Sequence, residues 1–252
     1  ITTVTLDGYA SASIGINALV ADTKLDALTT LNLSNNTAGG DVAVATDATT
    51  LALNVDNITA TANAVVNLDH NGNATADGSA TVTDLTLASA GKASAFELQT
   101  DKLENLTINA AVALDIKTNA ATSYANVELV TVDVNGAGAV DLGILTSSTA
   151  LTSFDASGNT GGVTVTVEAD KGTLTGTLTE YVLSEGADKV LVMAAGGTAA
   201  DVKVSAGAGD DTVTLSGITT LGSTISGGTG TNTIQMTAAD AETASGATTF
   251  ET

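Results

Sequence analysis

A short apolar pattern recurs along most of the chain. It has the form apolar-x-x-apolar-x-apolar, and its second half alternates apolar and polar residues as a strand with one buried face does. Copies begin at Ile1, Leu28, Ala48, Val82, Leu103, Leu129 and Leu151. Turn-forming Asn, Gly and Ser residues follow most copies. One strand with its turns every 20 to 27 residues predicts an all-β fold, a parallel β-helix (β-solenoid) whose strands stack coil upon coil.

The pattern changes near residue 160. Before this point Leu-x-Leu strands dominate, and after it glycine-rich turns precede short β-branched strands. Three such turns, in 184–191, 206–215 and 227–234, share the form Gly-x-(Asp/Asn)-x-(Val/Ile) and follow one another at spacings of 23 and 21 residues. We therefore describe 1–160 and 161–252 as two parts of the solenoid, with one continuous domain as the alternative.

Two other folds compete with the solenoid. The segment Leu28-x-x-Leu31-x-Leu33-x-x-Asn36 matches the leucine-rich-repeat consensus, although later copies lose the asparagine. Alternating runs at 163–167 and 173–178 would suit a hairpin of an antiparallel sandwich. Little helix is expected, with short helices over 10–28, 93–103 and 238–244 as the candidates.

The composition restricts the partners and the chemistry. The chain has 28 acidic residues against seven lysines and no arginine, and its formal charge of −21 disfavours nucleic acid as a partner. Its periodic apolar residues, 43% of the total, argue against disorder. No cysteine is present, which excludes disulfides and thiolate sites, and no apolar run is long enough for a membrane span. Because the chain opens on Ile1 and shows no signal peptide, we interpret it as an interior piece of a longer protein.

The Gly-x-Asp turns are the strongest candidates for a functional site. Glycine permits a tight turn, and the acid supplies a hard oxygen ligand of the kind that Ca²⁺ prefers. The alternative is that each Asp only stabilises a β-turn by accepting a hydrogen bond from the backbone two residues on.

These turns resemble the nonapeptide Gly-Gly-x-Gly-x-Asp-x-U-x of RTX proteins, where U is a large apolar residue. Segment 206–214 departs from it only by Ala206, and 227–235 only by Asn232. RTX arrays repeat every nine residues, whereas these turns occur once per coil. The resemblance implies Ca²⁺ ligands from side chains and backbone oxygens at Asp188, Asp211, Asn232, Gly186, Gly207, Gly209, Gly228 and Gly230, with Asp201 and Asp210 as additional ligands.

The whole composition is similar to that of Gram-negative surface-layer (S-layer) proteins and RTX-type adhesins exported by type I secretion. This resemblance implies a structural, calcium-dependent segment of an S-layer lattice at the bacterial cell surface, outside the cell. The alternative is a stalk segment of a large secreted adhesin. The expected partners are further copies of the chain, in a lattice or filament, and cell-surface polysaccharide.

The sequence contains few candidate catalytic residues. The only histidine, His70, lies in a polar turn-like segment, and no nucleophile motif accompanies it. A β-helix polysaccharide-active enzyme remains a minor alternative, although aromatic residues are only 2% of the chain. A second minor alternative is an ice-binding surface of stacked threonines. It is disfavoured because the threonines do not recur at the same position in each coil. We expect no enzymatic activity and no catalytic residues.

Overall fold

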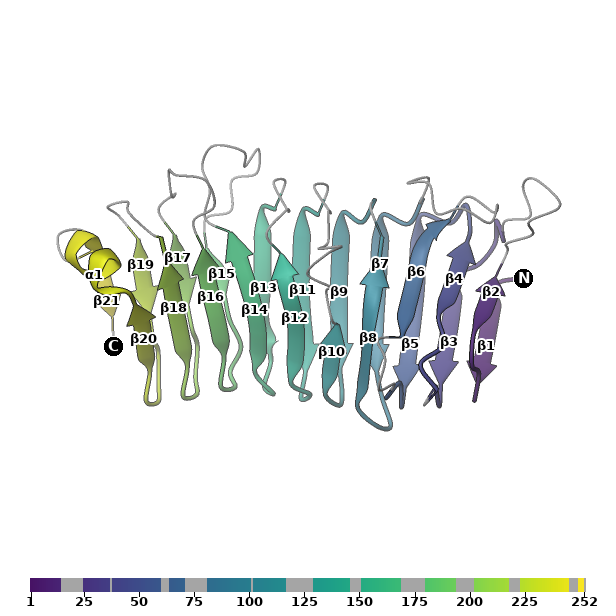
Figure 1. The fold of residues 1–252 in the computed structure, drawn as a ribbon, viewed down its shortest axis with the longest axis horizontal. Coiled ribbons are helices and arrows are strands. Elements are labelled where there is room, and N and C mark those ends of the chain that lie inside the picture. The colour runs from purple at the N-terminus through teal and green to yellow at the C-terminus, as the bar shows by residue number, and fades with distance from the viewer. Residues whose placement is uncertain are drawn as a thin grey trace.

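The computed structural model shows an elongated parallel β-solenoid with two sheets facing each other along its length (Figure 1). It describes residues 1–14, 25–36, 38–59, 64–70, 81–100, 102–116, 129–145, 151–168, 180–193, 202–217, 223–244 and 249–251. The prediction of an all-β solenoid with little helix is confirmed.

Odd-numbered strands form an 11-stranded sheet and even-numbered strands form a 10-stranded sheet. The first contains β1 (Thr3–Asp7), β3 (Thr30–Ser34), β5 (Thr50–Asp56), β7 (Asp84–Ser89), β9 (Asn105–Ala110), β11 (Thr131–Gly136), β13 (Ser153–Asn159), β15 (Tyr181–Val182), β17 (Lys203–Ser205), β19 (Thr224–Ser226) and β21 (Thr249–Glu251). The second contains β2 (Ala12–Ile14), β4 (Val42–Ala45), β6 (Val65–His70), β8 (Ser94–Gln99), β10 (Leu114–Ile116), β12 (Val140–Leu145), β14 (Val163–Glu168), β16 (Lys189–Met193), β18 (Thr212–Ser216) and β20 (Thr233–Met236).

The strands stack in parallel, each on its equivalent in the next coil. In the 11-stranded sheet, for example, Leu85 lies opposite Leu106 and Leu87 opposite Ile108. The run at 163–167 lies in β14, which pairs in parallel with both β12 and β16, and the other arm of the expected hairpin, 173–178, lies outside the described residues. This pairing rules out the antiparallel sandwich, and the leucine-rich repeat fails because its helix is replaced by a second strand.

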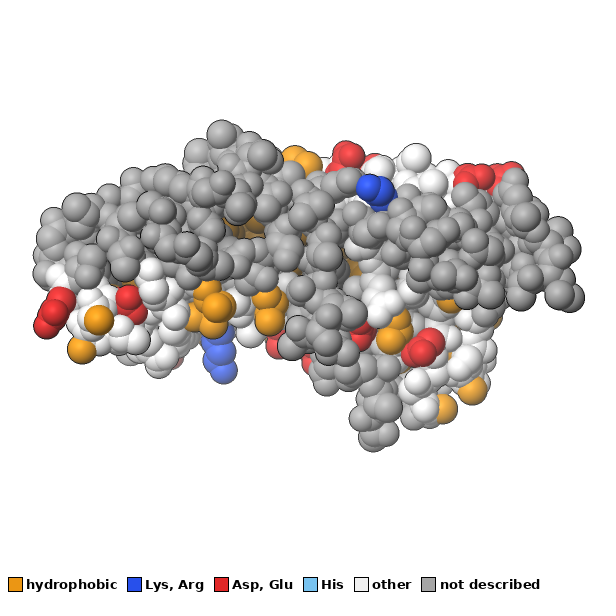
Figure 2. Space-filling model, turned by 45° about the horizontal axis from the view of Figure 1, so that its top comes forward, with side chains coloured by type: hydrophobic (Ala, Val, Ile, Leu, Met, Phe, Trp, Pro, Cys, Tyr) orange, Lys and Arg blue, Asp and Glu red, His pale blue; other side chains and the backbone are white. Residues whose placement is uncertain are grey.

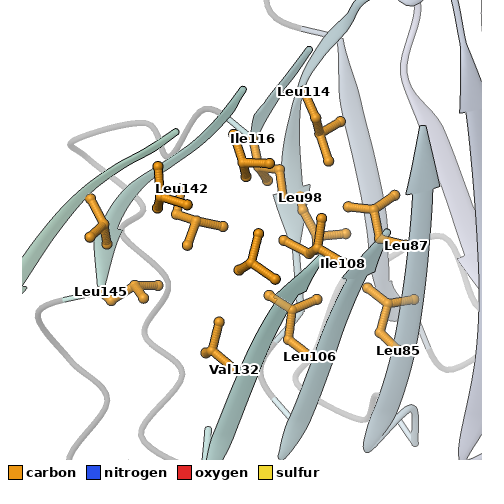
Figure 3. Packing of buried hydrophobic residues seen from close by; sticks show 14 of the residues in the cluster. Leu85, Leu87, Leu98, Leu106, Ile108, Leu114, Ile116, Val132, Leu142 and Leu145 are labelled. Carbon is orange, nitrogen blue, oxygen red and sulfur yellow. The ribbon is translucent and has the colours of Figure 1, made fainter. Parts of the chain in front are cut away.

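The core lies between the two sheets and follows the predicted alternation. Leu85, Leu87, Leu106 and Ile108 of the 11-stranded sheet are buried and point towards Leu98, Leu114 and Leu142 of the other sheet (Figure 3). Apolar side chains fill most inward positions in successive coils and give one continuous apolar interior rather than separate clusters. Both sheets continue across residue 160 through β12–β14 and β13–β15.

Two of the helix predictions are wrong in the described residues. The segment 93–103 forms β8, because pairing with β6 and β10 overrides the helix propensity of its Ala, Glu and Leu residues. In the segment 10–28, residues 12–14 form β2, and residues 15–24 lie outside the described part of the chain. The third prediction is confirmed, since α1 spans Ala238–Ala244. It is too short to cross a bilayer, and no helix in the described part of the chain is long and apolar enough to do so.

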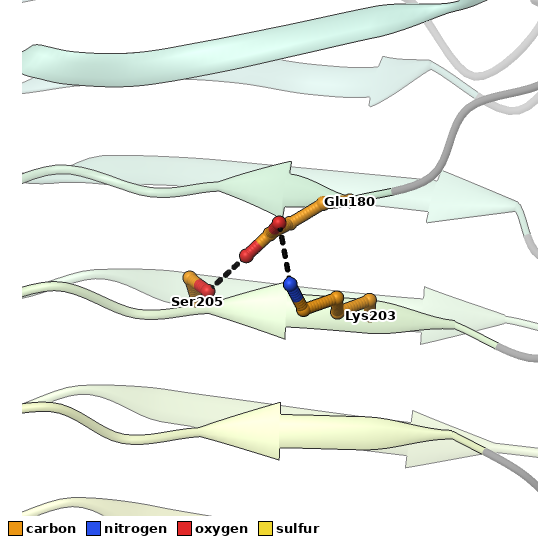
Figure 4. Close-up of polar contacts among 3 residues, drawn as sticks. All are labelled: Glu180, Lys203 and Ser205. Carbon is orange, nitrogen blue, oxygen red and sulfur yellow. Dashed lines mark hydrogen bonds and ion pairs between the residues drawn. The ribbon is translucent and has the colours of Figure 1, made fainter.

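Acidic side chains are scattered over the described part of the face drawn in Figure 2. One acidic side chain is neutralised across adjacent coils: the Glu180 carboxylate accepts a hydrogen bond from Lys203 Nζ at 2.8 Å and another from the Ser205 hydroxyl (Figure 4). Hydrogen bonding by Lys203 and Ser205 lowers the pKa of Glu180. With seven lysines for 28 acids, most carboxylates must be accommodated in another way.

Candidate functional site

The predicted turn residues lie in the connections that lead from the 11-stranded sheet into β16, β18 and β20 (Figure 1, lower edge). The sheet register aligns Asp188, Asp211 and Asn232 with one another, one per coil. It also aligns Asp188 with Val163 of the preceding coil. In the coils before that, the same inward column is occupied by Leu114 and Val140. Asp188 and Asp211 therefore replace aliphatic side chains in a core column, and Asn232 continues that column at an exposed position.

These three side chains form a hydrogen-bonded ladder, hereafter the turn ladder. The backbone N–H of Asp188 donates to Asp211 Oδ1 at 2.9 Å, and the N–H of Asp211 donates to Asn232 Oδ1 at 3.0 Å. Asn232 Nδ2 donates to the Gly227 carbonyl at 2.7 Å. In each of the three residues, the Oδ1 atom thus accepts a hydrogen bond from the main chain of the coil before it.

Asp188 is the most fully bonded member of the turn ladder. Its Oδ1 accepts the Val163 N–H at 2.6 Å and the Ser184 hydroxyl at 2.6 Å, and its Oδ2 accepts the Ser184 N–H at 2.9 Å. The side chain is 1% exposed. Because these donors satisfy both oxygens, the buried Asp188 carboxylate links two coils by hydrogen bonds and also stabilises its own turn.

Asp211 is different, because its Oδ2 atom is buried and has no hydrogen-bond partner. The pKa of the Asp211 carboxyl is raised to about 6, mainly by burial and in smaller part by the charges of Asp188 and Asp210, while the hydrogen bond from the Asp188 N–H lowers it. Burial also raises the pKa of Asp188, against the hydrogen bonds from Ser184 and Val163. The turn ladder therefore contains one carboxylate oxygen that a proton or a cation would stabilise.

The predicted glycines have the conformations that the turns require. Gly207, Gly209, Gly228 and Gly230 all have positive φ, between 65° and 121°. Their coils also approach closely: the Gly207 carbonyl accepts the Thr229 N–H at 3.0 Å. At Gly186 the close approach is to the N–H of Gly162, which would lie 2.4 Å from an added Cβ.

Of the two additional ligand candidates, Asp210 does not join the turn ladder. Asp210 is exposed, and its Oδ1 accepts the Thr231 N–H of the next coil at 2.7 Å. Asp201 lies outside the described residues. In the part of the chain that the structure describes, no three or more His, Cys, Asp or Glu side chains form a group that could hold a metal ion. Among the side-chain oxygens of the turn ladder, Asp211 Oδ2 is the one without a hydrogen-bond partner, so it is the atom that could serve as a cation ligand.

Sequence reasoning missed two buried asparagines that do similar work in earlier turns. Asn159, fully buried, accepts the N–H groups of Gly161 and Gly162 and donates to the Gly138 carbonyl of the preceding coil. Asn36 accepts the Gly39 N–H at 3.1 Å within its own turn. The signal was an Asn two or three residues before a glycine, which also occurs in ordinary exposed turns.

Comparisons with known proteins identified no relative of this chain. No protein-family model, no curated protein and no solved structure matches this chain. The arguments below therefore rest on the residues and their geometry.

Raising the pH from about 4 to about 6 is expected to destabilise the fold through Asp211. The folded pKa of about 6 exceeds the value of about 3.9 for an unfolded aspartate, so the folded state binds this proton more tightly. This contribution is complete below about pH 4 and is lost as the pH rises through about 6. Thermal melts at pH 5 and pH 7 measure it.

The control for this prediction is Asp211→Asn, which cannot titrate and should show a smaller difference between the two melts. A variant with the same pH dependence as the unsubstituted chain would show that general repulsion among the acids, rather than Asp211, controls the effect.

Proposed function

We propose that this chain is a rigid, non-catalytic segment of a cell-surface protein whose copies assemble into an S-layer-type lattice. The observation that supports this best is the unbroken parallel stacking of 11 and 10 strands around one apolar core. With about 4.8 Å between neighbouring strands, ten spacings give a rod about 48 Å long. A rod held by hydrogen bonds along its axis suits a building element that transmits force or sets a spacing.

The strongly negative charge of the chain argues against a role in nucleic-acid binding. A formal charge of −21 repels phosphate backbones. Copies of the chain also repel one another, so cations between them would favour their association. In the calcium-rich environment outside a cell, carboxylates on neighbouring copies would be bridged or screened. Cell-surface polysaccharide remains a candidate partner from the resemblance alone.

Calcium also enters this proposal through Asp211. A cation at Oδ2 would supply the partner that this buried atom lacks and would offset the repulsion from Asp188 and Asp210. Because the other turn-ladder oxygens accept hydrogen bonds, few protein ligands are left. We therefore expect weak binding, with a dissociation constant of about 1 mM, as in extracellular calcium modules.

The experiment is a thermal melt and an assembly assay of the same protein in EDTA and in 10 mM CaCl₂. Binding at about 1 mM would stabilise the fold by about 1.4 kcal/mol, or about 4 °C in Tm for a domain of this size. Asp211→Asn should abolish that shift, whereas the exposed Asp155→Asn should keep it. Electron microscopy should show ordered two-dimensional arrays only with calcium.

The outcomes separate the parts of the proposal. An equal melting temperature in EDTA and calcium would remove calcium from the fold. A chain that stays monomeric at high concentration with calcium would contradict the lattice and favour the adhesin stalk, which requires the same rod but no lateral contacts.

A further inference from the structure

The outer face of the 10-stranded sheet carries an unpaired cation. Lys189, the first residue of β16, is exposed and precedes the buried Val190 in the alternation of that strand. In the sheet register its neighbours are Thr164 of β14 and Thr212 of β18, so neither adjacent strand places a carboxylate beside it on this face. In the part of the chain that the structure describes, Lys189 forms no ion pair. A chain with seven lysines for 28 acids thus leaves one of them unused within the molecule.

Apolar side chains lie beside Lys189 on the same face. Leu191 and Met193 follow it at alternate positions of β16 and are half-buried. A shallow groove of about 370 Å³ crosses β14, β16, β18 and β20 here, and Lys189 and Leu191 line it together with threonine side chains. This face therefore offers a positive charge, hydroxyl groups and a small apolar surface.

The outer face of the 11-stranded sheet carries a pair of acids. Asp133 of β11 and Asp155 of β13 lie opposite each other in the register, and both are exposed. Asp133 Oδ1 accepts a hydrogen bond from the Asn135 side chain at 3.0 Å, and Asp155 Oδ1 accepts the Ser157 N–H at 2.9 Å. Neither acid pairs with a cation among the described residues. Because neighbouring strands are about 4.8 Å apart, the two like charges destabilise each other.

Neither the cation nor the acid pair has its complement within the same rod. Lys203, which lies on the same sheet as the acids, is already paired with Glu180 at 2.8 Å (Figure 4). Lys189 belongs to the opposite sheet, on the far side of the core (Figure 1). The complement of each face is thus present on the other face of the molecule, where only a second copy can use it.

We propose that a second copy of this chain docks the acid pair on its 11-stranded sheet against Lys189 on the 10-stranded sheet of the first. The two contact faces differ and lie on opposite sides of the rod. The contact is therefore heterologous, and each copy keeps one free face of each kind, so that copies add side by side into an open row. This inference rests on the proposed lattice role and names one of its lateral contacts.

The two faces also suit each other in size and shape. Sheets pack face to face about 10 Å apart. Ten strand spacings by about five residues measure about 48 Å by 17 Å, or about 800 Å², which is the area that each partner buries in a stable interface. Val182, next to Asp155 in the register and half-buried on β15, supplies an apolar side chain on the acidic face that would complement Leu191 and Met193.

The test uses the fact that every copy carries both halves of the contact. Lys189→Glu removes the cationic half and keeps the acids, whereas the double variant Asp133→Asn with Asp155→Asn removes the acidic half and keeps Lys189. Sedimentation is measured in EDTA, which excludes calcium bridges, and at 0.15 M salt, where the Debye length of about 8 Å screens remote repulsion. The unsubstituted chain should self-associate, and each variant alone should associate about tenfold or more weakly.

Mixing the two variants gives the decisive result. Each pair of unlike copies has one intact contact, so an equimolar mixture should form 1:1 dimers that do not grow further. Lys92→Glu is the matched control, because Lys92 is exposed in a turn and the substitution changes the net charge equally. It should change self-association less than about twofold. Circular dichroism melts would establish that each variant is folded.

The outcomes separate this contact from the lattice role. A mixture that stays monomeric, or equal weakening by Lys189→Glu and Lys92→Glu, would overturn the contact. Ordered arrays of the unsubstituted chain in calcium would then still support the lattice. Dimers in the mixture without arrays in calcium would instead support the contact and contradict the lattice.

Discussion

Asp188→Ala is expected to lower the free energy of unfolding by about 3 to 5 kcal/mol. The substitution strands the N–H groups of Val163 and Ser184 and deprives the Ser184 hydroxyl of its closest acceptor. Each buried polar group left without a partner costs about 1 to 3 kcal/mol. The damage spans two coils, because Val163 is 25 residues from Asp188 in sequence. Denaturant unfolding measures the loss, and hydrogen exchange at Val163 and Ser184 localises it.

Two variants calibrate this result. Asp188→Asn keeps an acceptor oxygen but presents an amide to one of the donors, so an intermediate loss is expected. Asp155→Ala removes an exposed acid from the opposite sheet and should cost less than about 0.5 kcal/mol. If Asp188→Ala cost no more than Asp155→Ala, the turn ladder would not be what holds these coils together.

Gly228→Ala is expected to destabilise the last coils by about 3 kcal/mol. Its φ of +65° disfavours an L side chain, which costs about 1 to 2 kcal/mol. In addition, a Cβ at this position would lie 1.8 Å from the carbonyl oxygen of Gly207 in the preceding coil. The Gly207 backbone could move away from this Cβ only if the two coils separated, so we expect an additional steric cost of about 1 to 3 kcal/mol.

Gly8→Ala separates these two costs. Gly8 has nearly the same φ, +62°, but no atom lies within 4 Å of a Cβ built on it. Gly8→Ala should therefore lower the free energy of unfolding only by the conformational cost of the positive φ, about 1 to 2 kcal/mol. Thermal melts and hydrogen exchange of the two variants give the difference. Equal losses would mean that the coils are not packed as closely as the structure indicates.

The turn ladder also bears on the calcium proposal. The sequence presents Asp188, Asp211 and Asn232 as three equivalent positions, but their roles in the structure differ. Asp188 is saturated with donors, Asn232 lies exposed at the end of the column, and only Asp211 keeps a buried oxygen without a partner. Substitution of Asp211 alone should therefore remove any calcium response, whereas substitution of Asp188 should damage the fold with or without calcium.

The predicted strands of the 11-stranded sheet were correct because their signal is local. Leu31 and Leu33, like Leu85 and Leu87, alternate with polar residues, and all are buried. In the 10-stranded sheet, the predicted run at 163–167 and the β-branched segments after the Gly-x-Asp turns correspond to β14, β16, β18 and β20, whereas the strands before residue 160 were missed. The missed strands are short or carry helix-favouring residues, as in Ser94–Gln99, which has a strand of the neighbouring coil on each side.

The sequence by itself determined the repeat, the apolar face of each strand and the glycines at positive φ, since each depends on a residue and its immediate neighbours. Only the tertiary structure decided what each ladder oxygen binds. The donors that reach Asp188, Asp211 and Asn232 from the preceding coil come from residues 21 to 25 positions away. Which N–H faces which carboxylate depends on the length of every turn between them, and thus on the register of the whole stack.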